Sequence, residues 1–302
     1  MVVLWTGIEL DMVISRSVAV LMAVYQGERF LREQLDSILA QRNVTFDVYI
    51  SIDASNDNSF NICSEFAEKY ENISILPTGG QYGSAGANFY RLISDVDFSS
   101  YDYVSFSDQD DIWLPNKLSR AVDVLINSDC VGYSSDVIAF WPDGKVKAVV
   151  KSQDIKEYDY FFESAGPGCT YVLKESFLSE FQKLLKVSFS QVKDITQHDW
   201  LIYHFARSKD FEWFIDSNAG MLYRQHDDNV LGVNTGLKTI WARWRKIHSG
   251  WAGAQALAIR NVVGSSKIDI TKKSVLLRNF LKLRRKKSEA WVFLLLIMLG
   301  IY

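Results

Sequence analysis

The sequence has few of the residues that mark disulfide-rich, disordered or membrane-spanning proteins. Its 302 residues include three cysteines, Cys63, Cys130 and Cys169, with no CxxC pair, so neither a disulfide framework nor a zinc knuckle is expected. Only 4 prolines and 17 glycines argue against long disordered linkers. The apolar segment 291–302 has 12 residues, whereas a helix that spans a bilayer needs about 20. These scarcities favour a globular protein in a reducing cytoplasm.

Charge is unevenly distributed along the chain. The net charge of −3 conceals a basic tail, because the chain from Lys238 onward carries 14 Lys and Arg residues against 2 acidic ones. The part before it carries 19 basic and 34 acidic residues, so the charge is +12 in the tail and −15 ahead of it. We therefore predict an extension at 1–16, a large domain at 17–237 and a basic helical tail at 238–302. Residues 1–11 show no evident signal peptide.

The first half of the chain alternates short apolar strands with amphipathic helices. Strands are predicted at 18–23, 46–53, 73–76 and 103–107, and a helical pattern follows each of the first three. This alternation predicts an α/β fold with βαβ units and a mainly parallel sheet flanked by helices. Ligands bind at the carboxyl ends of the strands in such sheets, and Asp53 and Asp108 fall at two of these ends.

The second half has a looser pattern. We predict helices at 118–126 and from His198, a loop at 151–163, strands at 131–140 and 166–173, and a late strand pair at 213–216 and 220–224.

An acidic run follows the fourth predicted strand. Asp108, Asp110 and Asp111 place three carboxylates within four residues. Like charges so close together repel unless a cation compensates them, and Mg²⁺ or Mn²⁺ prefers such oxygen ligands and bridges substrate phosphates. Taken alone, the run is equally consistent with an acidic loop that caps the next helix.

A glycine-rich turn precedes the third predicted helix, with Gly79, Gly80, Gly83 and Gly86 ahead of Asn88. Glycines let a backbone approach a ligand closely, and a helix N-terminus favours phosphate. Similar glycines are also common in ordinary turns. The turn does not follow the first strand with GxGxxG spacing, which argues against a dinucleotide-binding dehydrogenase.

Three blocks of the sequence resemble glycosyltransferase family 2, whose members have the GT-A fold. They are VLMAVYQGERFL at 20–31, SIDASNDNS at 51–59 and FSDQDDIWLPNK at 106–117. The bacterial rhamnosyltransferase-like subgroup is the most similar, and the resemblance covers residues 17–232. The sequence departs from the family pattern at Gln26, Ile52 and Ala54. These departures weaken the assignment of the donor more than that of the activity.

The resemblance implies roles for particular residues. Asp199, after His198 at a helix start, would be the general base. Asp108 and Asp110 would bind a divalent metal, Mg²⁺ or Mn²⁺, with His226 as an additional ligand. Asp53 would accept a hydrogen bond from a pyrimidine base, and Arg224 would contact the diphosphate. With Gly83 and Asn88 of the glycine-rich turn included, the expected nucleotide-sugar-binding residues are Ala23, Tyr25, Glu28, Asp53, Gly83, Asn88, Asp108, Gly168 and Arg224.

The expected activity is an inverting, metal-dependent sugar transfer from a nucleotide-diphosphate sugar, with dTDP-rhamnose favoured by the subgroup resemblance. The acceptor would be a hydroxyl of a glycan or of a lipid-linked oligosaccharide in surface polysaccharide synthesis, and no nucleic acid partner is expected. Two alternatives remain open. One is a nucleotidyltransferase acting on sugar phosphates, and the other is an inactive module that binds a nucleotide sugar or a carbohydrate.

The basic tail has tryptophans at helical spacing. Trp241, Trp244, Ile247 and Trp251 alternate with arginines and lysines, and a cationic amphipathic helix of this kind suits an anionic membrane surface. We therefore expect a cytoplasmic protein that is peripheral on the cytoplasmic face of a membrane. The alternative is that the apolar stripe of the tail packs on the large domain.

Overall fold

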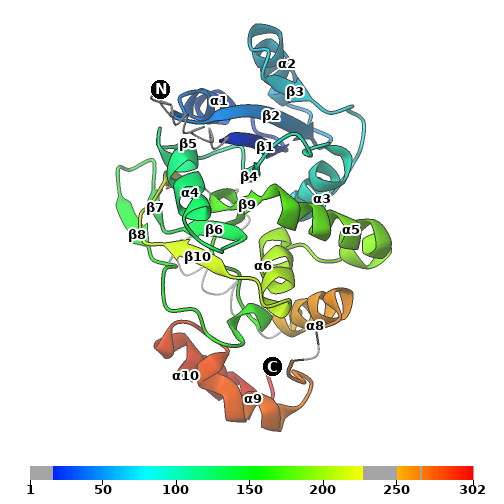
Figure 1. Ribbon diagram of the computed structural model, residues 1–302, viewed down its shortest axis with the longest axis vertical. Coiled ribbons are helices and arrows are strands. Elements are labelled where there is room, and N and C mark those ends of the chain that lie inside the picture. Colours follow the sequence, from blue (N-terminus) through cyan, green and yellow to red (C-terminus); the bar gives the residue numbers. More distant parts are fainter. Residues whose placement is uncertain (1–15, 227–249, 266, 302) are drawn as a thin grey trace, which may run out of the picture.

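The computed structural model describes residues 16–226, 250–265 and 267–301. Within them, the strands form two sheets with helices on both sides of the larger one (Figure 1). The boundary predicted at 237/238 lies outside the described residues, as do residues 1–15 and Trp241, Trp244 and Ile247.

The larger sheet has seven strands in the order β10-β6-β9-β4-β1-β2-β3. All neighbours pair in parallel except β9, which is antiparallel to both β4 and β6. The prediction of a mainly parallel sheet is therefore confirmed. The strand bounds are β1 (Ser17–Val24), β2 (Thr45–Ile52), β3 (Ile73–Ile75), β4 (Tyr103–Ser107), β6 (Gly132–Ser135), β9 (Val172–Lys174) and β10 (Trp213–Asp216).

The side chains of strand β1 are buried on both faces of the larger sheet. Its side chains alternate between two core clusters, with Ala19, Leu21 and Ala23 in one and Val18, Val20, Met22 and Val24 in the other. A strand buried on both faces has a continuous apolar sequence. The first cluster contains residues from α3 (Ala85–Asp95), α5 (Glu175–Val192) and α6 (His198–Ser208), and the second contains residues from α1 (Leu31–Leu39), α2 (Ser59–Lys69) and α4 (Lys117–Ile126).

The smaller sheet has the order β5-β11-β7-β8, formed by β5 (Ile112–Trp113), β11 (Met221–Arg224), β7 (Val137–Phe140) and β8 (Val146–Val149). Strand β11 is antiparallel to β5, which directly follows the acidic run 108–111, and parallel to β7. This pairing brings Arg224, the last residue of β11, and His226 just after it to the acidic run.

The structure corrects the expected strand at 131–140. Asp136 interrupts it, so that β6 joins the larger sheet and β7 the smaller one. The buried Asp136 carboxylate accepts hydrogen bonds from the backbone N–H groups of Lys151 and Ser152, at 2.6 and 2.9 Å. These bonds anchor an incoming loop at the point where the chain changes sheets.

The expected strand pair at 213–216 and 220–224 is also wrong. Both strands form, but β10 pairs with β6 whereas β11 pairs with β5 and β7. The strand expected at 166–173 begins only at Val172, because Gly168–Thr170 forms a 3₁₀ turn, η2. Helix α5 was not predicted.

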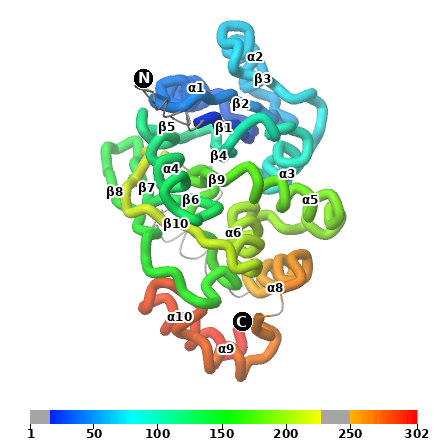
Figure 2. Tube along the Cα trace, in the orientation of Figure 1, coloured from blue at the N-terminus to red at the C-terminus, as the bar shows by residue number. Residues whose placement is uncertain are grey.

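The described part of the basic tail consists of α8 (Trp251–Val263), α9 (Lys273–Asn279), the 3₁₀ turn η3 (Phe280–Lys282) and α10 (Lys287–Met298). These elements lie at the opposite end of the molecule from α2 (Figure 2). Helix α8 packs against α5 and α6, and Ile259, Leu283 and Ile297 belong to the same core cluster as α3 and α6. No described helix is both long enough and apolar enough to cross a bilayer.

Candidate functional site

The loops that carry the predicted residues meet at one edge of the larger sheet. Strand β1 lies between β2 and β4, with Val24 opposite Ile52 and Met22 opposite Ser107. Because these strands are parallel, the segments that follow them leave the sheet side by side. Tyr25, Asp53 and Asp108 therefore begin three neighbouring loops.

Gln109 joins two of these loops. Its side chain accepts a hydrogen bond from the Tyr25 N–H and donates one to the Tyr25 carbonyl oxygen, both at 2.7 Å. A Cβ atom at Gly27 would lie 2.5 Å from Gln109 Oε1, so a larger residue there would displace the Gln109 amide from Tyr25. Gln109 was not among the predicted site residues, which included only acidic members of the 108–111 run. Gln109 lies within the block 106–117 that carries the family resemblance, and this position could have marked it as a site residue.

Asp53 organises the glycine-rich turn. Its buried carboxylate accepts hydrogen bonds from the backbone N–H groups of Tyr82 at 2.9 Å and Gly83 at 3.0 Å. Gly83 has a φ of +77°, a conformation that favours glycine. In the structure Asp53 thus holds Gly83 at the strand ends, and its contact with a base stays a prediction.

Four predicted residues lie in or beside these loops. The buried Asn88 amide accepts a hydrogen bond from the Ser51 hydroxyl and donates to the Ser51 carbonyl oxygen at 3.0 Å, so it braces the end of β2. Glu28 accepts a hydrogen bond from the Asn58 N–H at 2.8 Å. Tyr25 is 56% exposed, whereas Ala23 is buried at the end of β1. Tyr25 and Glu28 are the exposed members of this group, and both are open to a ligand.

The acidic run combines crowded carboxylates with a histidine. Asp110 Oδ2 lies 2.7 Å from His226 Nε2. Burial, with the Asp110 charge beside it, raises the pKa of Asp108 to about 7. Burial also raises the pKa of Asp111 well above its ordinary value, and Asp111 Oδ2 is buried without a hydrogen-bond partner. Several carboxylate oxygens and an imidazole nitrogen at one place fit a hard divalent cation.

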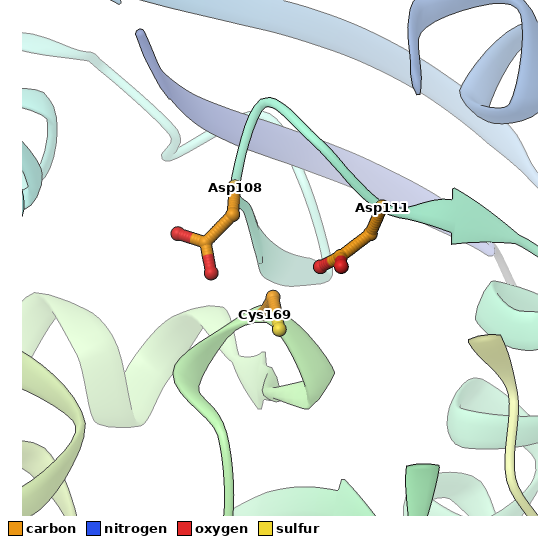
Figure 3. Close-up of side chains that lie close together, drawn as sticks. All are labelled: Asp108, Asp111 and Cys169. Carbon is orange, nitrogen blue, oxygen red and sulfur yellow. The ribbon is translucent and has the colours of Figure 1, made fainter. Parts of the chain in front are cut away.

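Cys169 lies against the acidic run (Figure 3). Its sulfur and one carboxylate oxygen from each of Asp108 and Asp111 lie within 4.8 Å of one another. Burial and the nearby charges of Asp111 and Asp108 raise the pKa of Cys169 well above its ordinary value, so the sulfur stays a neutral thiol beside the carboxylates. Mg²⁺ and Mn²⁺ prefer oxygen to sulfur. The donor set that fits them is therefore the aspartates with His226, and Cys169 supports it from below.

Arg224 is held beside the same run. Its Nε donates to the Asp110 carbonyl oxygen at 2.7 Å, and its guanidinium carbon lies 4.5 Å from the centre of the Phe30 ring and 4.7 Å from that of Phe140. The guanidinium also forms an ion pair with Glu33. Its contact with a diphosphate stays a prediction.

Asp199 occupies the first turn of α6. Its Oδ1 accepts a hydrogen bond from the Trp200 N–H at 2.8 Å. Burial raises the pKa of its carboxyl group to about 6, although the Trp200 N–H and the Ser164 hydroxyl oppose the shift. Ser164 is a second residue that the sequence analysis missed. A carboxylate with a pKa this close to neutrality is suited to accept a proton.

Gly168 places Asp199 across from the acidic run. A Cβ atom on Gly168 would lie 2.5 Å from His198 Nε2 and 3.3 Å from the Asp199 Cβ, so only glycine allows the η2 turn to press against the start of α6. The next residue, Cys169, touches the acidic run. The charge of Asp199 is near enough to contribute to the raised pKa of Asp108. His198 stacks on Phe89, and burial lowers its pKa to about 3, so its ring is neutral.

Residues 19–163 match the family model described as "Glycosyl transferase family 2". The dTDP-rhamnosyl transferase RfbG of Shigella flexneri is 42% identical to this chain over 289 residues, which are 93% of this chain and 100% of that protein. The chain belongs to glycosyltransferase family 2. This glycosyltransferase is also similar to the UDP-Glc:alpha-D-GlcNAc-diphosphoundecaprenol beta-1,3-glucosyltransferase WfgD of Escherichia coli, with 26% identity over 54% of this chain and 62% of WfgD.

Solved structures share the fold of this glycosyltransferase. Staphylococcus aureus TarS 1-349 in complex with UDP gives a TM-score of 0.58 at 13% identity, covering 94% of this chain and 80% of that chain. Mannosyltransferase PcManGT of Pyrobaculum calidifontis, in complex with GDP-Man and Mn²⁺, gives 0.51 at 14% identity over 94% and 85%. The predicted GT-A fold is confirmed, and family membership supports glycosyl transfer over the nucleotidyltransferase and inactive-module alternatives.

Proposed function

We propose that this enzyme transfers rhamnose from dTDP-rhamnose, with inversion, to a hydroxyl group of a glycan or lipid-linked acceptor in surface polysaccharide synthesis. The observation that carries the reaction is the position of Asp199, a half-buried carboxylate with a raised pKa that lies across the η2 turn from the acidic run. The name and the near-complete coverage of RfbG support the choice of donor. The name of WfgD supports a lipid-linked acceptor.

The chemistry that we propose is a single displacement. The Asp199 carboxylate takes the proton of the acceptor hydroxyl as its oxygen attacks the anomeric carbon from the face opposite the diphosphate. The new carbon–oxygen bond forms while the bond to the diphosphate breaks, and the bonding electron pair leaves with the diphosphate. A single displacement of this kind inverts the configuration at the anomeric carbon.

The acidic run and His226 fit a divalent metal, Mg²⁺ or Mn²⁺. Their donor set is rich in oxygen, and burial together with the neighbouring carboxylates raises the pKa values of Asp108 and Asp111, a repulsion that a cation would relieve. We propose Asp108, Asp110 and His226 as ligands, with Asp111 as an additional candidate. A divalent ion there would neutralise the charge that develops on the leaving diphosphate.

For the donor pocket, we propose a division of roles between contact and support. Tyr25 is exposed and suits direct contact with the nucleotide. Arg224 would contact the diphosphate by replacing its ion pair with Glu33 by one with a phosphate group. Asp53 and Asn88 support the pocket through the backbone groups they hold. The other residues that we propose for this pocket are Ala23, Glu28 and Gly83 near the strand ends and Gly168 in the η2 turn.

The test is a panel of dTDP-rhamnose, UDP-glucose, UDP-GlcNAc and GDP-mannose, incubated with purified enzyme and Mg²⁺, Mn²⁺ or a chelator. We expect slow hydrolysis of dTDP-rhamnose that requires the metal, measured as released dTDP. Hydrolysis of another donor would refute the sugar assignment while leaving the class intact. Unchanged hydrolysis in chelator would refute the metal proposal, and turnover of none of the donors would refute the proposed donor chemistry.

We also propose that 17–237 is the catalytic domain, 1–16 an extension and 238–302 a tail with which the enzyme sits peripherally on the cytoplasmic face of a membrane. Among the described basic residues of this tail, Arg285 and Lys282 pair with acidic residues of the catalytic domain. Part of the tail therefore serves as packing, and the membrane proposal depends on the part that remains exposed.

A further inference from the structure

Helix α10 is apolar on its exposed side as well as on its buried side. Ala290, Phe293 and Ile297 face the core. The opposite side carries the α10 stripe, whose residues follow the spacing i, i+1, i+4, i+7 and i+8 of one helical face. The stripe consists of Trp291 (59% exposed), Val292 (59%), Leu295 (52%), Met298 (52%) and Leu299 (62%).

An exposed stripe of this kind requires a partner that removes it from water. A helix that is apolar all round is normally buried, and contiguous apolar patches on a protein surface mark interaction sites. Trp291 packs edge-on against Phe280 of η3, with 5.0 Å between the ring centres. The stripe is therefore anchored to its neighbouring element.

The charges around α10 indicate what the partner is. Arg284 pairs with Glu289, and Lys282 with Glu157. Lys286 and Lys287, at the start of α10, and Arg278 at the end of α9 are exposed, and the described residues provide no ion pair for them. Cations next to an apolar stripe suit an anionic lipid surface, where a Lys or Arg near the headgroups adds attraction. Between two copies of this chain, the same cations would repel.

We infer that the α10 stripe, flanked by Lys286 and Lys287, docks this glycosyltransferase on an anionic lipid bilayer. Its 12 residues span about 18 Å, so the helix lies in the membrane interface with its stripe among the acyl chains. The docking surface is thus α10, whereas the sequence pattern had pointed to 241–251. The inference deepens the proposed function, since a lipid-linked acceptor would be presented at the same surface.

The experiment is flotation of the full chain with vesicles of phosphatidylethanolamine and phosphatidylglycerol (7:3), compared with phosphatidylcholine alone. Wild type should float with the anionic vesicles, and less so at high salt. Leu295→Glu should lower the apparent vesicle affinity at least about tenfold, because it places a charge in the stripe. The double variant Lys286→Glu/Lys287→Glu should lower it by about tenfold or more, since two attractive charges become repulsive.

Matched controls come from α5. Val187→Glu places the same charge on a residue that is 88% exposed, and Lys183→Glu/Lys186→Glu reverses two exposed lysines; neither should change flotation. Wild-type binding by Leu295→Glu, or no flotation of wild type, would overturn the inference. So would a lipid-free dimer of wild type that Leu295→Glu converts to a monomer, because the stripe would then be a protein interface. Hydrolysis of dTDP-rhamnose in solution, measured alongside, separates failure of docking from failure of the proposed reaction.

Discussion

Asp199 and Asp108 are half-buried, and the loss of solvation raises the pKa of their carboxyl groups to about 6 and about 7. Their different neighbours suit Asp108 to binding a metal and Asp199 to accepting a proton. Asp108 lies beside Asp110 and Asp111, where a cation would favour the charged form. Asp199 has the Trp200 N–H and the Ser164 hydroxyl, which stabilise its charge only in part.

Removing the proposed base should abolish most of the turnover. Asp199→Asn is expected to lower kcat by about 100- to 10,000-fold, the usual contribution of a general base, while the Kd of the donor changes little. Asp154→Asn, at an exposed acid, is the control. Steady-state transfer rates and calorimetric donor titration provide the measurement, and normal turnover by Asp199→Asn would disprove the assignment.

The pH dependence follows from the same carboxyl group. Asp199 accepts a proton only when ionised, so kcat/KM should fall as the pH decreases through about 6, the pKa of Asp199. The group is fully active above that value. A profile of kcat/KM between pH 5 and 8 at saturating metal tests this, and a flat profile across pH 6 would contradict it.

Stability should change in the opposite direction. The folded-state pKa of about 6 lies above the ordinary value of 3.8, so ionisation of Asp199 costs stability, with no cost below pH 3.8 and the full cost above about pH 6. That cost is about 3 kcal/mol. Asp199→Asn should therefore be more stable than wild type in urea unfolding at pH 8, with a smaller difference at pH 5. If Asp199→Asn and wild type were equally stable at both pH values, ionisation of Asp199 would carry no cost in folding free energy.

At the scale of elements, the site depends on loops that hold one another through backbone groups. Gln109 joins the loop after β1 to the loop after β4, and Asp53 joins the end of β2 to the glycine-rich turn. The η2 turn then links the acidic run to α6. Each link fixes the relative position of two segments that are distant in the sequence.

Breaking the first link should weaken donor binding. Gln109→Leu removes both hydrogen bonds to Tyr25, so the loop that bears Tyr25 loses its fixed position. We expect the KM for the donor to rise about tenfold, from a loss of about 1–2 kcal/mol, with a smaller change in kcat. Gln153→Leu, at an exposed site, is the control. An unchanged donor KM would refute the positioning role.

Adding one methyl group at Gly168 should separate η2 from α6. The new Cβ would lie 2.5 Å from His198 Nε2, and such overpacking costs about 1–3 kcal/mol. We expect Gly168→Ala to lower kcat strongly while Tm falls only modestly, because Asp199 shifts with the helix start. Gly253→Ala in α8, where a Cβ would meet nothing within 4 Å, should leave kcat unchanged. Wild-type kcat in Gly168→Ala would show that the close approach is not needed.

At the scale of the whole molecule, the tail packs against the catalytic domain and inserts a buried arginine into it. The Arg285 side chain is only 1% exposed, and it pairs with the fully buried Asp159 at 3.2 Å and with Glu163 at 3.5 Å. It also donates to the Ser164 carbonyl oxygen at 2.6 Å. The tail thereby reaches Ser164, whose hydroxyl donates to the Gly166 carbonyl oxygen at 3.0 Å just before the η2 turn.

Loss of this buried cation should destabilise the entire domain. Arg285→Met leaves Asp159 and Glu163 without compensation, which typically costs about 3–5 kcal/mol and should lower Tm by roughly 10 °C. Lys282→Met removes an exposed ion pair with Glu157 and should have little effect. Thermal unfolding of both variants is the measurement. A Tm for Arg285→Met equal to that of Lys282→Met would refute a structural role for the buried pair.

The sequence by itself determined the elements whose patterns are local. The continuous apolar run of β1 and the strand–helix alternation up to Ser107 predicted a parallel sheet, and the polar residues after those strands predicted its functional edge. The early strands came out within one or two residues because burial on both faces leaves a clear pattern. The block 106–117 also contained Gln109, although its side-chain bonds could not be read from composition.

Tertiary structure decided what depends on contacts between distant segments. The split of 131–140 at Asp136 and the separate sheets of β10 and β11 follow from long-range pairing, which local periodicity does not encode. The thiol of Cys169 at the acidic run, the hydroxyl of Ser164 at Asp199 and the burial of Arg285 each require a partner far away in the chain. A side chain's charge state and exposure depend on such partners, so its chemistry emerges only when the fold brings them together.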